Sequence, residues 1–137
     1  MQLSRMPCTW PFQALADESR FRVVRLLASI GSPLSAGQLS AALRCEPNHI
    51  SRHLQVLESA GLTRVERVGR FHFVSLRPDG ANEVLAAAVL RMPDDAGALA
   101  GDLARLLDAP RSGPAPLDYS AEGSSAGPSA AGGSMGL

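Results

Sequence analysis

The clearest pattern in the chain is a pair of short amphipathic helices joined by a tight turn. Apolar residues recur at the three- and four-residue spacing of a buried helix face. They are Leu39, Leu43, Ile50, Leu54 and Leu57. Ser35 precedes the first helix and carries the side chain of an N-terminal cap. Pro47 suits the first turn of the second helix, and Gly61 is typical of the position past a helix end. The pattern predicts that the second helix runs from about Pro47 to Ala60.

This second helix carries a polar face opposite its apolar one. The polar residues are Asn48, His49, Ser51, Arg52, His53 and Gln55. Asparagine and glutamine pair with adenine edges, arginine pairs with guanine, and serine or histidine reaches bases or phosphates. A solvated face on an ordinary surface helix is the alternative interpretation. The preceding helix, the turn and a basic hairpin that follows favour a recognition helix that contacts DNA.

Residues 63–77 alternate as a half-buried β-hairpin does, with a turn at Val68-Gly69. On the return strand, the predicted faces are Phe71, Phe73 and Ser75 on one side and Arg70, His72 and Val74 on the other. The basic side chains expected to contact DNA are Arg64, Arg67, Arg70 and His72, with the arginines clustered near the tip. Charge that protects a strand edge is an alternative compatible with this role. Helices and hairpin together predict a winged helix-turn-helix.

Further helices are predicted on both sides of this block. Apolar spacing indicates two helices between Phe12 and Ile30, with Asp17 or Ser19 as a cap. Pro78-Asp79 opens another helix after the hairpin, and a final helix spans about 95–108. The apolar face of this final helix is predicted to form a dimer interface through Leu99, Leu103 and Leu106. Burial of these leucines in the core of their own chain is the alternative.

The runs Phe12–Leu27 and Ile50–Leu62, followed by the Gly69-Arg70 wing, resemble the ArsR/SmtB family of small bacterial repressors. The resemblance covers roughly residues 10–108. It implies a mainly α fold with a two-stranded β wing, in the order α-α-α-α-β-β-α. It also implies a homodimer whose terminal segments dimerise, and which binds an operator palindrome until a signal releases it.

The best-known metal sites of that family are not preserved in this chain. Where one site has two cysteines before the third helix, this chain has Ser35, Ala36 and Gly37. A second site uses Asp and His on the last helix, but no histidine follows His72. We therefore expect no metal site of either kind, and no cofactor.

The cysteines leave a sensing function open. Cys8 lies in the N-terminal arm, and Cys45 lies in the turn before the recognition helix. Some family members bring an N-terminal cysteine across the dimer to the DNA-binding helices. Such a pair would bind a thiophilic metal or metalloid ion, with His49 as an added ligand, or close as a disulfide. Inert cysteines, or modification of one cysteine alone, are the alternatives.

Composition divides the chain into an N-terminal arm (1–9), one small domain (10–109) and a tail (110–137). The tail is rich in Pro, Gly, Ser and Ala, which predicts disorder. No apolar stretch approaches the length of a membrane span, and the N-terminus lacks a signal-peptide pattern. We therefore expect a cytoplasmic protein. The net charge is zero, but residues 44–77 hold six arginines against three glutamates, which suits DNA.

Catalysis is not expected, because Cys45 and His49 have no third orienting group or Gly-rich loop near them in the sequence. A winged helix that binds protein instead of DNA, and an activator instead of a repressor, are further alternatives. The sequence predicts a sequence-specific regulator that binds double-stranded operator DNA. It is expected to be a homodimeric repressor of its own or a neighbouring operon, released by an unidentified signal.

Overall fold

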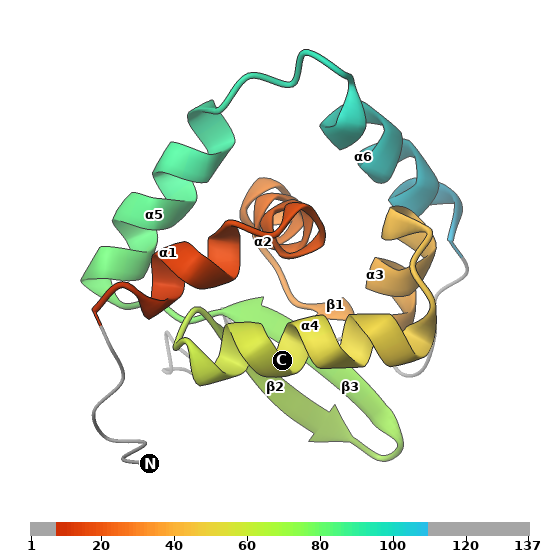
Figure 1. Cartoon of the computed structure of the whole chain (residues 1–137). Helices are drawn as coiled ribbons and strands as arrows, with labels where there is room; N and C mark the ends of the chain where they lie inside the picture. The colour runs from red at the N-terminus through yellow and green to blue at the C-terminus, as the bar shows by residue number, and fades with distance from the viewer. Residues whose placement is uncertain (1–7, 110–137) are drawn as a thin grey trace, which may run out of the picture.

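The computed structural model describes residues 8–109, in which six helices and three short strands follow one another (Figure 1). They are α1 (Trp10–Leu15), α2 (Glu18–Ile30), β1 (Leu34–Ser35), α3 (Ala36–Leu43), α4 (Pro47–Ser59), β2 (Thr63–Val68), β3 (Phe71–Leu76), α5 (Gly80–Arg91) and α6 (Ala98–Asp108). The predicted tail, and all of the predicted arm except its last two residues, lie outside the described residues.

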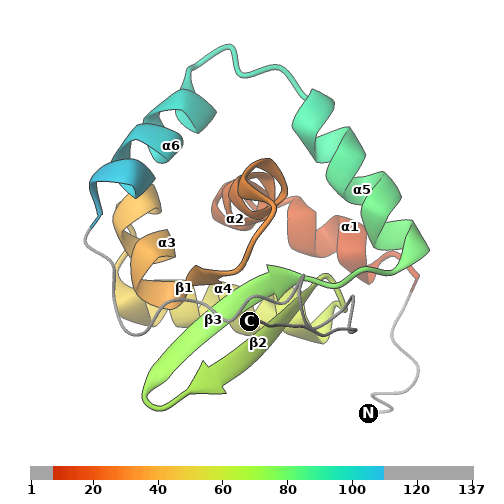
Figure 2. The same cartoon turned by 180° about the vertical axis from the view of Figure 1, so that it is seen from behind.

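The helix α2 lies in the middle of the fold. Figures 1 and 2 show it nearly end-on, with α1, α5, α6 and α3 around it and with α4 and the sheet along one side. Val23, Val24, Leu26 and Leu27 are consecutive or nearly so, and each exposes 2% or less of its surface. A helix that buries residues all round its axis needs neighbours on every side. The other elements therefore pack against α2 as a common core.

Local side-chain chemistry fixes where these helices begin. The Asp17 carboxylate accepts a hydrogen bond from the backbone N–H of Arg20 (3.0 Å) and caps α2. At the start of α3, Ser35 and Gln38 form a reciprocal capping box with bonds of 3.0 and 2.9 Å. At the other end of α2, Gly31 adopts a φ of 76°, in the left-handed region. The caps predicted at Asp17 and Ser35 are confirmed.

The sheet has three antiparallel strands in the order β1-β3-β2, where the sequence predicted a two-stranded ribbon. The two-residue strand β1 adds Leu34 opposite Val74 and Ser35 opposite Phe73. β3 is thus the central strand with both edges paired at this point, and Phe73 and Val74, which point to opposite faces, are both buried. Val74 lies on the same face of β3 as His72, as predicted, but it is buried whereas His72 is exposed.

Two helices, α5 and α6, follow the wing, whereas the order α-α-α-α-β-β-α has only one helix at that place. The break between α5 and α6 falls after Arg91, as Pro93 predicted. Leu106 exposes only 7% of its surface and belongs to the core, and Leu99 and Leu103 are half-buried against it. Leu106 thus packs within its own chain, whereas the assignment of Leu99 and Leu103 to a dimer interface stays a prediction.

Candidate nucleic-acid interface

The helix α4 separates its residues into a buried face and a solvent-facing one. Ile50, Leu54 and Leu57 expose 6% or less and hold the helix on the core. The exposed residues between them are Asn48, His49, Ser51, Arg52 and Gln55. Five of the six polar residues that the sequence assigned to DNA contact on this helix therefore face solvent. Their side chains offer the donors and acceptors that base edges and phosphates require.

The sixth residue, His53, has a different environment. It is half-buried, with Nδ1 3.4 Å from Nη1 of Arg20 and 3.9 Å from Oδ2 of Asp17. Arg20 is itself fixed, because its Nε donates to the carbonyl of Ala14 (2.7 Å). His53 thus links the recognition helix to the start of α2 instead of facing outward with its neighbours. Contact of His53 with DNA stays a prediction, and it would compete with the contacts to Arg20 and Asp17.

Asp17 and Arg20 are residues near the site that the sequence did not place there. Burial raises the pKa of Asp17, but the backbone N–H of Arg20 and the positive charges of Arg20 and His53 outweigh it, so the pKa lies below its ordinary value. The carboxylate is therefore charged at neutral pH beside His53. No sequence signal joins these residues, since 33 positions separate Arg20 from His53.

The turn that leads into α4 is held by its own backbone. Arg44 adopts a left-handed conformation (φ 54°), which is uncommon for a residue with a side chain. The N–H of Cys45 then donates to the carbonyl of Ser40 (3.0 Å), and the Ser40 hydroxyl donates to the carbonyl of Cys45. Pro47 begins α4 immediately afterwards. The direction of α4 is thus set at the C-terminal end of α3.

The wing is a hairpin with a two-residue turn, closed by the pair Val68–Phe71. Gly69 has a φ of 62°, a value that a glycine adopts easily at the first position of such a turn. The guanidinium of Arg70 lies 5.8 Å from the centroid of the Phe71 ring, a cation–π contact that orients it at the tip.

The basic residues of the wing occupy both of its faces. Arg64, Arg67, Arg70 and His72 are all exposed. Arg67 is paired with His72, and Arg64 is paired with Ser75 farther from the turn. Because side chains alternate along a strand, Arg64 and Arg67 point to opposite faces. The predicted cluster of three arginines at the tip is therefore reduced to Arg67 and Arg70.

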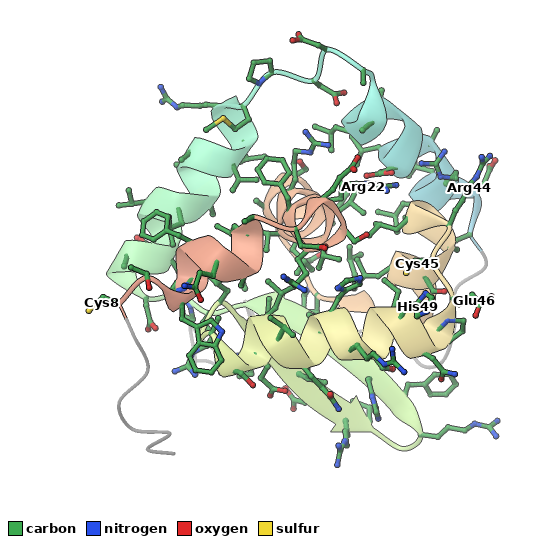
Figure 3. The ribbon with its side chains drawn as sticks, viewed as in Figure 1. Cys8, Arg22, Arg44, Cys45, Glu46 and His49 are labelled. Carbon is green, nitrogen blue, oxygen red and sulfur yellow. The ribbon has the colours of Figure 1, made fainter. Side chains whose placement is uncertain are left out.

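The two cysteines lie in different regions of the protein. Figure 3 shows Cys8 at one side, by α1, and Cys45 at the other, where Cys45 and His49 lie close together near the start of α4. Cys45 is half-buried, and burial raises the pKa of its thiol although the charge of Arg22 opposes this effect. Cys45 is thus mainly a protonated thiol at neutral pH. Within residues 8–109, no three His, Cys, Asp or Glu side chains are gathered as a metal site.

The helices that the structure describes include none with the length and apolar character needed to cross a membrane.

Comparisons with known proteins agree with this geometry. Residues 15–66 match the model of a helix-turn-helix domain family. The chain is 38% identical over 68 residues to the HTH-type transcriptional regulator YceK of Bacillus subtilis, covering 50% of this chain and 68% of that protein. It is 38% identical over 68 residues to the arsenic resistance transcriptional regulator ArsR2 of Pseudomonas putida, covering 50% of this chain and 58% of the relative. A SmtB homologue of Synechocystis is 38% identical over 65 residues, which are 47% of this chain and 48% of that protein.

Among solved structures, HlyU from Vibrio cholerae has a similar fold, with a TM-score of 0.56 at 24% identity. The superposition covers 61% of this chain and 87% of HlyU. Helix-turn-helix, recognition helix and wing thus occur together, in a chain similar in sequence to known transcriptional regulators. The protein belongs to the ArsR/SmtB family of helix-turn-helix proteins and is a DNA-binding transcriptional regulator.

Proposed function

We propose that the protein is a homodimeric repressor, not an enzyme, that binds operator DNA of its own or a neighbouring operon in the cytoplasm. The observation that carries this proposal is the exposed polar face of α4, which stands beside a basic wing. In such an arrangement the helix enters the major groove and the wing follows the flanking backbone. Repression follows because a bound dimer blocks access to the promoter.

The surface proposed for dimerisation is formed by α1 and α5. Both helices pack against α2, and in Figures 1 and 2 they lie on the same side of it. Phe12 on α1 is 63% exposed and Val84 on α5 is 69% exposed, and Leu90 on α5 is also exposed. Large exposed apolar side chains on these two helices favour contact with a partner surface. A second copy of the chain packed there would give the two-fold symmetry that palindromic operators match.

Within this dimer, each residue set has a separate task. Asn48, Ser51, Arg52 and Gln55 would contact base edges and so determine which sequence is bound. Arg67 and Arg70 would contact phosphates and contribute affinity for any duplex. A signal that changes the angle between the two recognition helices would release the operator with a coupling of a few kcal/mol.

Fluorescence anisotropy tests the proposal directly. A labelled duplex from immediately upstream of the protein's own gene is titrated with protein, beside a duplex of scrambled sequence. Arg52→Ala is expected to weaken binding to the promoter duplex by about ten-fold or more, as loss of a good arginine–guanine pair does. The matched control is Arg91→Ala, at the exposed C-terminal end of α5.

The control variant should bind as the wild type does. Equal binding of the two duplexes, unaffected by Arg52→Ala, would instead favour a winged helix that binds protein. Analytical ultracentrifugation of Phe12→Asp and Val84→Asp tests the dimer separately, since a charge at the proposed interface should yield monomers.

A further inference from the structure

One fully buried carboxylate has no part in the interface described above. Asp102, in the middle of α6, exposes none of its surface. It lies outside the helix-turn-helix match over residues 15–66. A charge is expensive to bury unless it is paired and hydrogen-bonded, so its partners indicate what the residue does.

Two arginines from different helices meet at this carboxylate. Arg22 on α2 donates through Nε to Oδ2 (3.0 Å) and through Nη2 to Oδ1 (2.6 Å). Arg105, one turn along α6, donates through Nη2 to Oδ1 (2.8 Å). The hydrogen bonds to Asp102 raise the pKa of Arg22 above its ordinary value, so this guanidinium stays charged at any physiological pH.

The same two guanidiniums also reach the C-terminal end of α3. Arg105 Nε donates to the carbonyl of Ala42 (2.7 Å), and Arg22 Nη2 lies 3.4 Å from the carbonyl of Leu43. The last carbonyls of a helix have no partner inside the helix, and they carry its negative dipole end. Asp102 thus orients two positive donors over the end of α3, the point at which the turn into α4 begins.

The turn also has local contacts, because the N–H of Cys45 donates to the carbonyl of Ser40 and the Ser40 hydroxyl donates to the carbonyl of Cys45, so its direction depends on where the C-terminal end of α3 lies. After Leu43 come Arg44 in a strained left-handed conformation, Cys45, and Glu46, whose side chain makes no capping hydrogen bond at the start of α4. A shift of the α3 end would therefore move the start of α4, where Asn48 and His49 lie. Leu106 and the half-buried leucines already hold α6 on the core, so packing alone does not account for the buried charge.

We propose that Asp102 is a positioning residue for DNA recognition, acting through Arg22 and Arg105 on the turn between α3 and α4. This inference rests on α4 being the recognition helix. It makes α6 part of the DNA-binding unit, although none of the residues assigned to DNA contact lies on α6. Anything that pulls α6 away from α3 would weaken specific binding.

Asp102→Asn tests the inference, because asparagine keeps the shape of the side chain and removes its charge. The matched control is Asp108→Asn, an exposed carboxylate at the end of the same helix. Hydrogen–deuterium exchange of the free protein is measured over residues 43–50, and anisotropy gives the affinities for the promoter and the scrambled duplex. In Asp102→Asn, exchange over 43–50 should rise, and the promoter-to-scrambled affinity ratio should fall about five-fold or more. Asp108→Asn should change neither.

The inference is overturned if Asp102→Asn accelerates exchange only within α6 and keeps the wild-type affinity ratio, since the carboxylate then merely stabilises its own helix. If Asp102→Asn does not fold, Arg105→Gln removes one of the two donors and should give the same changes in smaller size. Failure of the proposed function looks different: the wild type would then not discriminate between the duplexes. In that case the exchange over 43–50 alone decides whether Asp102 positions the turn.

Discussion

Arginines serve opposite purposes on the two sides of this small domain. On the α2–α6 side, Arg22 and Arg105 form ion pairs with Asp102. The guanidinium carbon of the buried Arg25 lies 5.1 Å from the centroid of the Phe21 ring, and its Nη1 lies 3.7 Å from Oδ1 of Asp94. On the α4 and wing side, four arginines are exposed, and within residues 8–109 none of these four forms an ion pair with the protein. They are Arg52, Arg64, Arg67 and Arg70.

The difference shows that the role of an arginine depends on whether a carboxylate lies beside it. An arginine with such a partner stabilises the fold, and one without it can bind a ligand. A guanidinium with a carboxylate at hydrogen-bonding distance has already exchanged its water for a protein partner. An exposed guanidinium without one remains available for a phosphate or a base edge. Variants that remove charge should therefore act on stability on one side and on DNA affinity on the other.

The largest effect is expected on the α2–α6 side, where the arginines are paired with carboxylates. Asp102→Ala leaves two guanidiniums without their carboxylate and should lower the free energy of unfolding by about 3 kcal/mol. Replacing Asp102, Arg22 and Arg105 together by leucine should recover most of this loss, because no unpaired charge is then left. Urea denaturation followed by circular dichroism measures both changes. A loss equal to that of Asp108→Ala would mean that the ion pairs contribute little.

A smaller and different effect is expected at the wing. Arg67→Ala and Arg70→Ala should each weaken binding to promoter and scrambled duplexes by a similar factor. Each should also reduce the slope of log affinity against log salt by about one, since a phosphate contact releases counterions. Their free energies of unfolding should stay within about 0.5 kcal/mol of the wild type, as is usual at exposed positions. An unchanged salt slope in both variants would remove the wing tip from the DNA interface.

The smallest effect is expected at Asp94, on the α2–α6 side, and it concerns the free energy of unfolding at low pH. Asp94 accepts hydrogen bonds from the backbone N–H of Leu99 (2.8 Å) and of Ala100 (3.2 Å), and the bond from Leu99 does most to lower its pKa below the ordinary value of 3.8. A lowered folded-state pKa means that the ionised carboxylate stabilises the fold. This contribution is complete above the ordinary pKa and is lost as the pH falls through the folded-state pKa.

Asp94→Asn should therefore make the free energy of unfolding less dependent on pH below about pH 4. Urea denaturation at a series of pH values measures it, and Asp95→Asn, at the neighbouring exposed carboxylate, is the control. Identical pH profiles for Asp94→Asn and the wild type would show that the hydrogen bonds from Leu99 and Ala100 to Asp94 do not contribute to the loss of stability at low pH.

The DNA-facing elements could be predicted from the sequence because their signals are local. Apolar residues at helical spacing, the Ser35 cap, Pro47 and Gly61 all act within a few positions, and together they place α3, α4 and the start of the wing. The alternation of the hairpin likewise depends on adjacent residues. The same spacing predicts which polar residues of α4 are exposed, except for His53, which is half-buried.

What the sequence did not predict depends on contacts between distant residues. β1 is too short to give a period-two pattern, so its pairing with β3 and the burial of Val74 had no local signal. The face of α6 was judged from its leucines alone, and both a partner chain and the chain's own core satisfy that pattern. Asp102 lies on the same helix, but its role is visible only beside Arg22.

The bond between Arg22 and Asp102 also has a consequence for how the protein is made. The two residues are 80 positions apart, so this contact closes a loop that contains the whole helix-turn-helix and wing. Loops of this length form late, because the entropy of bringing their ends together must be overcome first. During synthesis, α3 and α4 leave the ribosome before Asp102 has been added to the chain. The residues of the recognition helix are therefore synthesised before the residue that holds the end of α3 in place.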